Sequence, residues 1–568
     1  MTPLPLEAPP DARHNREEVA LAGRWWARAP LLAVALPLGV AAAIAIARHP
    51  ALVLGGDFAF VEQAVVDAEH ARQLLGSVDR FGVAHLGPAQ YYLLAPVYWA
   101  LGNHAYALAV GSLVLVAVAA MAIVALAARH AGLGFALAAG VVVILYLHAI
   151  GDERLREPWG PWAIMMPAVL FAVLTAAWAA GSRAALLGAL LTGTFIVQTH
   201  VSTPPTLAAI LLAAWLARRF GGARDASLGA HAGRRELLVL GALGALLALA
   251  WVPPLIEQVT DHPGNLTLLY RFLRHPHGGF DGTGFPPTIV PASQDLSQAV
   301  SGLGLELSVF PTGRSAALLG TVQDPGVLPH RARLLLVLLY AALAVALVVL
   351  AHRRGDRFAL ALGAATLVSM ATAVLSFTRI AGPFFDYLIS WATALPVILW
   401  LGWAALVTGW LRSAPAGRRG RAGPLLAAGT GCLLVAASLG ETVALVRLPS
   451  LDAIATPQGP DPTLAPAAAL VRSDLAASPG RALLRIADLD TWPVAAAVGN
   501  QLLRHDEPVA VAGAWLYMFG DAYRPTGEER VEYTFADATR AAPPPPATLL
   551  GRVGDVAVYR RELAGGGR

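Results

Sequence analysis

The feature of this sequence that most limits its fold is a series of apolar runs, most of them close to the roughly 20 residues that a helix needs to cross a bilayer. We find about eleven such runs. They cover 30–47, 105–128, 133–150, 161–180, 184–200, 203–217, 237–256, 334–351, 358–377, 384–411 and 424–446. Because only helices and closed barrels satisfy their backbone polar groups in lipid, the runs predict an all-α polytopic membrane protein with about eleven transmembrane helices.

The composition agrees with this fold class. Of the 568 residues, 56% are hydrophobic and 14% are charged, whereas soluble domains are roughly 25% charged. The net charge of +4 is small and dispersed, which argues against a nucleic-acid partner. The chain has a single cysteine, Cys432, so it can form no intrachain disulfide.

The arginines predict which way the chain crosses the membrane. Residues 1–29 are polar and precede the first apolar run, which indicates a cytoplasmic tail followed by a signal-anchor helix. With the N-terminus inside, alternate joints between runs are rich in arginine, as cytoplasmic loops are. These joints carry Arg129, Arg183, Arg218, Arg219, Arg234, Arg235, Arg353, Arg354, Arg357, Arg412, Arg418, Arg419 and Arg421. The loops 49–104 and 258–333 and the segment 447–568 are then predicted to lie outside.

The last of these segments differs in composition from the rest. Strand-like sequences occur at 481–487, 508–512 and 556–560, and a helical pattern covers 492–504. We therefore predict three parts: the tail 1–29, a transmembrane module over 30–446, and a small extracytoplasmic α/β domain over 447–568. The aromatic segment 91–101 is too short to span and is predicted to be a helix lying in the outer interface.

Carboxylates gather on the predicted outer side. Asp57 follows Gly55-Gly56 at the end of the first run, where it could cap the next helix or act as a general base. Glu62 follows five residues later, and Asp152 and Glu153 stand in the loop after the third run. Ionisable groups from distant segments that meet at one membrane face point to a functional site.

Basic, polar and aromatic residues are predicted at the same depth. Arginine binds phosphate through two hydrogen bonds, and indole faces stack on sugars, so these side chains suit a sugar phosphate. The candidate substrate-binding residues are Arg80, His85, Arg156, Trp159, His200, Glu257 and Arg379. The plainer alternatives are a solvated loop for 152–157 and structural hydrogen bonds for the histidines at helix ends.

In this arrangement the chain resembles the GT-C superfamily of membrane glycosyltransferases that use polyprenyl-phosphate sugars, which includes mannosyl-, aminoarabinose and arabinofuranosyltransferases. The matching features are Asp57 after the first run, a long first outer loop, and Gly87-Pro88 followed by Tyr91-Tyr92. An acidic loop after the third run and a C-terminal outer domain complete the resemblance. Where the family has a pair of acids after the first run, this chain has Gly56-Asp57-Phe58, with Glu62 as the next acid. The loop after the third run reads Gly151-Asp152-Glu153-Arg154, which leaves open which of Asp152 and Glu153 is the second acid.

The resemblance implies an inverting glycosyltransferase. Asp57 would take the proton from an acceptor hydroxyl on a glycan, lipid or protein, and arginine and histidine would hold the leaving lipid phosphate. Paired acids from two loops could bind a divalent ion such as Mg²⁺, Mn²⁺ or Ca²⁺, and the metal requirement stays open. The expected location is the plasma (inner) membrane, with the donor's lipid tail between the spans and the product in the cell envelope.

Two other functions remain open from the sequence. A flippase or transporter of lipid-linked glycans would be expected to carry polar groups at mid-bilayer depth and to show inverted repeats. A glycan polymerase or ligase that uses a diphosphate-linked donor would place its catalytic residues in the loop 258–333. Its candidates are Arg271, Arg274 and His275.

Overall fold

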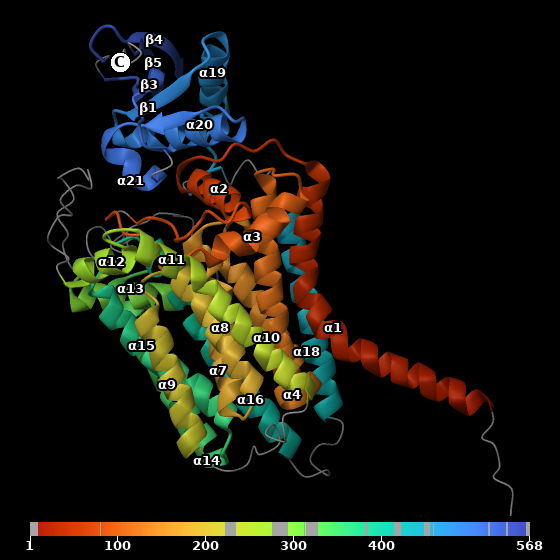
Figure 1. The fold of residues 1–568 in the computed structure, drawn as a ribbon. Coiled ribbons are helices and arrows are strands. Elements are labelled where there is room, and N and C mark those ends of the chain that lie inside the picture. The colour runs from red at the N-terminus through yellow and green to blue at the C-terminus, as the bar shows by residue number, and fades with distance from the viewer. Residues whose placement is uncertain are drawn as a thin grey trace, which may run out of the picture.

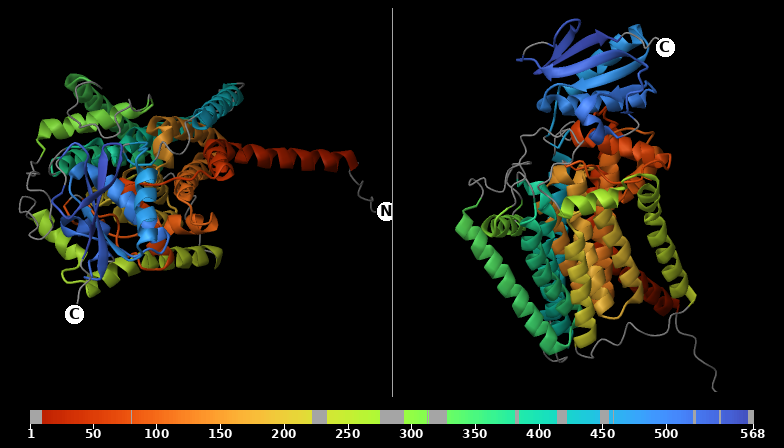
Figure 2. Two further views of the ribbon diagram at one scale, coloured as in Figure 1. Left: turned by 90° about the horizontal axis from the view of Figure 1, so that it is seen from above. Right: turned by 60° about the vertical axis from the view of Figure 1, so that its left-hand side comes forward.

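The computed structural model describes residues 10–79, 81–221, 234–274, 294–311, 313, 328–380, 384–413, 422–447, 455–457, 459–520, 523–540 and 543–563. These residues form a helical bundle with a small sheet-containing domain at one end (Figure 1). The N-terminal part of α1 points away from the bundle at the opposite end (Figures 1 and 2).

The bundle consists of helices whose apolar composition suits lipid. Their bounds are α1 Pro10–Arg48, α4 Tyr106–Ile150, α6 Gly160–Ala163, α7 Met165–Ala179, α8 Arg183–Thr199, α9 Pro204–Phe220, α10 Arg234–Ala250, α11 Val252–Thr260, α14 His330–Arg354, α15 Arg357–Phe377, α16 Ala394–Ser413 and α18 Ala422–Arg447. Within the described residues, eight helices are long and apolar enough to cross a membrane. The chain is therefore an integral membrane protein, as its sequence predicts.

The difference between eight helices and the predicted eleven spans has identifiable sources. The helix α4 runs over 45 residues, but Ala131 and Gly132 have non-helical backbone angles, and Gly132 has a φ of 71°. At 1.5 Å per residue, such a length is about twice what one crossing needs, and the break falls between the two predicted runs. The helices α8 and α9 have 17 residues each. The count of eleven is not confirmed and stays a prediction.

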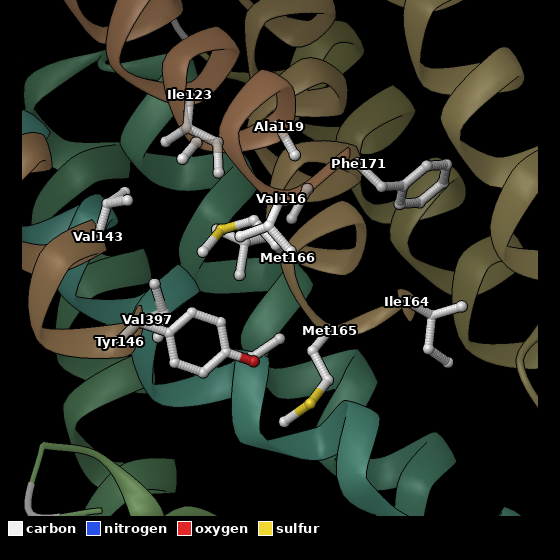
Figure 3. Close-up of a cluster of buried hydrophobic side chains, with 14 of the residues drawn as sticks. Val116, Ala119, Ile123, Val143, Tyr146, Ile164, Met165, Met166, Phe171 and Val397 are labelled. Atoms are coloured by element: carbon white, nitrogen blue, oxygen red, sulfur yellow. The ribbon is translucent and has the colours of Figure 1, made fainter. Parts of the chain in front are cut away.

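The bundle core is built from α4, α7 and α16. Figure 3 shows Val116, Ile123 and Tyr146 of α4 beside Met165 and Met166 of α7 and Val397 of α16. All of them are buried. Small residues let these helices approach closely, and both methionines fill the space between the larger side chains. This rigid centre supports the loops at the end that carries the candidate site.

Short helices cover that end of the bundle. They are α2 Gly56–Glu69, α3 Ala89–Ala100, α5 Asp152–Arg156, α12 Asn265–Arg274, α13 Leu296–Val309, η2 Asp386–Leu388 and η3 Ser390–Thr393. The helix predicted over 91–101 is present as α3. Figure 1 shows α2 and α3 between the bundle and the C-terminal domain.

The C-terminal domain contains one five-stranded sheet in the order β2-β1-β3-β5-β4. β1 is parallel to β2 and β3, whereas β5 is antiparallel to β3 and β4. The bounds are α19 Leu464–Ala477, β1 Arg481–Ile486, η5 Leu489–Thr491, α20 Trp492–Arg504, β2 Val509–Val511, η6 Gly513–Trp515, α21 Leu516–Phe519, β3 Glu529–Asp537, β4 Thr548–Val553 and β5 Val556–Glu562. The predicted elements appear as β1, α20, β2 and β5, while β3 and β4 were not predicted.

Candidate active site

Asp57 lies in the first turn of α2, next to the junction between the bundle and the C-terminal domain. The N-cap of α2 is Gly55, without a side-chain cap, so the expectation that Asp57 caps this helix is wrong. Within the described residues, its half-buried carboxylate has no hydrogen-bond or ion-pair partner. Burial raises the pKa of Asp57 to about 6. A free carboxylate with this pKa suits a general base.

Tyr91 of α3 connects Asp57 to the first outer loop. The Tyr91 hydroxyl lies 2.6 Å from the hydroxyl of Ser77. Burial raises the pKa of Tyr91 to about 12, and the negative charge of Asp57 adds to the rise. The phenol therefore stays protonated near Asp57. Ser77 in turn accepts a backbone hydrogen bond of 2.9 Å from His85.

His85 and His200 form a stacked pair beyond Ser77. Their ring centroids are 5.5 Å apart. The backbone N–H of Val201 donates to Nδ1 of His85 over 3.2 Å, which places the proton of the neutral ring on Nε2. Burial lowers the pKa of His85 to about 4 and that of His200 to about 3, with a further contribution to His200 from His85. Both rings are neutral at physiological pH, so they offer N–H donors and no positive charge to a phosphate.

Close contacts join α3 and the end of α8 to the loop that follows the third apolar run. The side chain of Gln90 donates to the carbonyl of Pro158 over 2.8 Å. A Cβ atom on Gly160 would lie 3.3 Å from the carbonyl oxygen of Thr199, so the absence of a side chain there permits the close approach. The sequence-distant segments around Gln90, Gly160 and Thr199 are thus held together.

Trp159 packs inside this junction. Its ring lies 6.4 Å from Phe58 and 4.8 Å from Tyr387, measured between centroids, and its side chain is 8% exposed. Trp162 is a third aromatic neighbour at 5.5 Å, and this aromatic enclosure favours a packing role for Trp159 over the predicted contact with a sugar. Trp159 thus connects α2 to η2.

Asp152, Glu153 and Arg156 belong to a different cluster. Asp152 lies beside Glu441 of α18, His148 of α4 and Arg156 of its own helix, and burial is the main cause that raises its pKa. Arg156 donates to the carbonyl of Leu445, and burial lowers its pKa. Within the described residues, neither a hydrogen bond nor an ion pair joins Asp57 to Asp152 or Glu153. Ionised carboxylates in one pocket form no hydrogen bond with each other, so the expected meeting of Asp57 with Asp152 and Glu153 stays a prediction.

Glu62 is fully buried and every oxygen of its carboxylate is occupied. One oxygen accepts hydrogen bonds from Tyr98 over 2.8 Å and from Arg504 over 2.9 Å. The other accepts from the amide of Asn500 over 2.6 Å. These contacts reach from α2 to α3 and α20, so the prediction that Glu62 is catalytic gives way to a structural role. Burial and the nearby Glu62 charge raise the pKa of Tyr98, which keeps its hydroxyl a donor.

The remaining candidates are spread over the same end of the bundle. Glu257 accepts a hydrogen bond of 2.7 Å from the backbone of Asn265, whose side chain bonds both backbone groups of Ala84. Glu257 thus supports Asn265, and Asn265 holds the first outer loop. Arg379 is exposed, without a side-chain partner in the described part of the chain. Arg271 and Arg274 are exposed on α12, and Arg80 and His275 lie outside the described residues.

Some residues of these clusters were not predicted. Asn500 and Arg504 are four residues apart on α20, a spacing that places both on one face of a helix, and this was the available signal. Glu441 and His148 were also missed. Glu441 is a carboxylate inside the apolar run 424–446, and a charged group in such a run is itself a sign of a special role.

The described residues contain no group of three or more His, Cys, Asp or Glu side chains that could hold a metal ion. A cavity of about 20 Å³ lies between α9, α15 and α16, lined mainly by apolar side chains and by Thr203, Thr206 and Ser369. The Thr203 hydroxyl donates to the carbonyl of His200, which places the cavity next to the histidine pair. It has room for a water molecule and is far smaller than a ligand pocket of roughly 300–1,000 Å³.

Comparisons with known proteins give a likeness to a solved structure. No protein-family model and no curated protein matches this chain. A crystal structure of ArnT from Cupriavidus metallidurans bound to undecaprenyl phosphate is similar, with a TM-score of 0.45 and 13% identity. The match covers 94% of this chain and 98% of that one. That TM-score is too low to establish a common fold.

Proposed function

We propose that this protein is a membrane-embedded inverting glycosyltransferase of GT-C type that uses a polyprenyl-phosphate sugar. One observation carries the proposal: Asp57 is a half-buried carboxylate with a raised pKa and no partner, at the bundle end where loops from distant segments meet. The order of motifs along the chain, from Asp57 through Gly87-Pro88 to the acidic loop at Asp152, supports it.

In this reaction Asp57 acts as the general base. It takes the proton of the acceptor hydroxyl while the acceptor oxygen forms a bond to the anomeric carbon of the sugar. The bond from that carbon to the phosphate oxygen breaks, and the polyprenyl phosphate leaves with the electron pair. Attack opposite the leaving group inverts the anomeric centre. A base whose pKa lies near the working pH makes this proton transfer efficient.

Uncharged hydrogen-bond donors near Asp57 would contact the sugar phosphate of the substrate. His85 and His200 remain uncharged and can donate N–H groups, and Tyr91 keeps its phenolic proton. The positive charge that balances the leaving phosphate then has to come from arginine, and Arg379 is an exposed candidate on the same end of the bundle. The proposal includes that this end of the bundle faces outward and that the product belongs to the cell envelope.

The test is transfer of a labelled sugar from a polyprenyl-phosphate donor by purified protein in liposomes. Asp57→Asn keeps the shape of the side chain and removes the base, so turnover is expected to fall by about 10²–10⁴-fold. Asp67→Asn is the matched control, because Asp67 lies on the same helix and pairs with Arg72 at the surface. Full turnover by the Asp57 variant would overturn the proposal.

A further inference from the structure

The helix that carries Asp57 has two opposite buried faces. Phe58, Val61 and Val65 belong to the core of the membrane bundle. Ala59 belongs to the core of the C-terminal domain, and Phe60 packs against that same core. The helix α2 is therefore a layer shared by both parts of the protein (Figure 1).

Contacts from the C-terminal domain run along the length of α2. At its start, the backbone N–H of Gly55 donates to Ala455 over 2.9 Å. The Phe60 ring lies 4.8 Å from Phe519 between centroids. One turn later the Tyr523 hydroxyl donates to Gln63 over 2.5 Å. These contacts fix the rotation of α2 about its own axis.

Glu62 is a charged residue within the contact between α2 and the C-terminal domain. It is 0% exposed and sits against Arg504, whose side chain is 22% exposed. The second nitrogen of that guanidinium donates to the carbonyl of Asn103 over 2.7 Å, so Arg504 also holds the segment that enters α4. A buried carboxylate with three partners has one stable geometry, because any shift of α2 leaves charge uncompensated.

We propose that Glu62 is a positioning residue, through which the C-terminal domain holds α2 in the one orientation that keeps the Asp57 carboxylate half-buried against the bundle. The two acids are five residues apart, about 140° around the helix, so a rotation of α2 that released Glu62 would also move Asp57 out of its present position. The inference rests on the proposed function for its effect on turnover. Its structural part stands independently of that function.

The first measurement is hydrogen exchange of the α2 amides, which needs no substrate. Glu62→Gln and Arg504→Met each leave one buried partner unmatched, so exchange over 56–69 is expected to rise by about tenfold or more. Glu69→Gln is the matched control, since Glu69 lies on the same helix without a hydrogen-bond partner in the described chain. Unchanged exchange in both variants would overturn the inference.

The second measurement is the pH profile of transfer. Looser packing of α2 admits water to Asp57 and lowers its pKa, so the acidic limb of the profile should move below pH 6 in both variants. A role confined to stability would lower turnover without moving that limb. Arg504→Lys keeps the positive charge, and it should return the limb toward its position in the unmodified protein.

The two proposals fail in different ways. If Asp57→Asn is fully active, the glycosyltransferase proposal falls, while the exchange result still decides how α2 is held. If Glu62→Gln does not fold, Arg504→Met supplies the same test from the less buried partner. Normal exchange and an unshifted acidic limb in Arg504→Met would then overturn the positioning role.

Discussion

The carboxylate of Glu62 and the guanidinium of Arg504 are 442 residues apart in the chain and 2.9 Å apart in the structure. The pair joins the first helix outside the membrane to a helix of the last domain. It also explains why a carboxylate close to the candidate base is unsuited to catalysis. All its oxygens already accept hydrogen bonds.

The pH dependence of transfer should report the ionisation of Asp57. A general base works only when deprotonated, so activity is expected to rise through pH 6 and to reach half its plateau there. The measurement is kcat/KM, which reports the pKa values of the free enzyme, against pH between about 3.5 and 8, a range that covers both pH 4 and pH 6. The residual activity of Asp57→Asn should show no such limb, and a midpoint near 4 would contradict the raised pKa.

Removal of the same carboxylate should stabilise the protein at neutral pH. The pKa of Asp57 is raised in the folded state from 3.8 to about 6. The favourable contribution of protonated Asp57 to folding stability is complete below pH 3.8, its pKa in the unfolded state. It is lost as the pH rises through about 6, its pKa in the folded state. Asp57→Asn should therefore be more stable at pH 7.5 by up to about 3 kcal/mol. A higher Tm for the variant at pH 7.5, but not at pH 4, is the expected result, and Asp67→Asn should show no comparable gain.

The histidine pair should make the protein sensitive to acid. Folding lowers the pKa of His85 to about 4 and that of His200 to about 3, from 6.5. The contribution of the two neutral rings to folding stability is present above pH 6.5, their pKa in the unfolded state. It is lost as the pH falls through their pKa values in the folded state. The Tm should fall between pH 6.5 and 4, and less steeply in a His85→Gln, His200→Gln double variant. His70→Gln, an exposed site, is the control, and an equal slope would refute the assignment.

Trp159 should tolerate a smaller aromatic ring. Because it packs between Phe58 and Tyr387, Trp159→Phe should keep most transfer activity, whereas Trp159→Ala should cost about 3–5 kcal/mol of stability. Thermal unfolding in detergent checks both variants. Trp99→Ala is the control, since that side chain is 72% exposed. Loss of activity in a fully stable Trp159→Phe protein would instead favour direct contact with a sugar.

Asn265 should hold the first outer loop in place. Its side chain makes hydrogen bonds of 3.0 and 2.9 Å to the backbone of Ala84, next to His85. Asn265→Ala should therefore increase hydrogen exchange over 77–87 and weaken transfer without affecting α7. Thr260→Ala is suitable for comparison, because the Thr260 hydroxyl bonds only within its own segment. Unchanged loop exchange would remove this role.

The sequence predicted the parts of the fold that depend on local patterns. Apolar runs located the helices of the bundle, and the α3 segment was recognised by its aromatic residues and its length. The break at Ala131 and Gly132 was predicted from the gap between two runs, although the chain stays helical on both sides. β3 was missed because Glu529 and Glu532 interrupt its apolar pattern, and their pairing with Arg481 and Arg485 is visible only in three dimensions.

The candidate site was predicted less completely, for the same reason. Asp57 and His200 were named from their position at the ends of apolar runs, and His85 from its place in the first outer loop, which sequence can supply. The partners that decide their chemistry come from far along the chain. Nothing local indicates that Glu62 meets Arg504, or that Asp152 lies beside Glu441.

Because α2 contributes to two hydrophobic cores, the boundary between the membrane part and the outer part is not a place where the chain can be cut. A shortened protein ending at residue 447 would expose Phe60 and leave the Glu62 carboxylate without its partners Asn500 and Arg504. A chimaera carrying a foreign outer part would need a matching version of residues 56–69 as well. Those residues lie near the opposite terminus, so the two ends of the gene are constrained to change together.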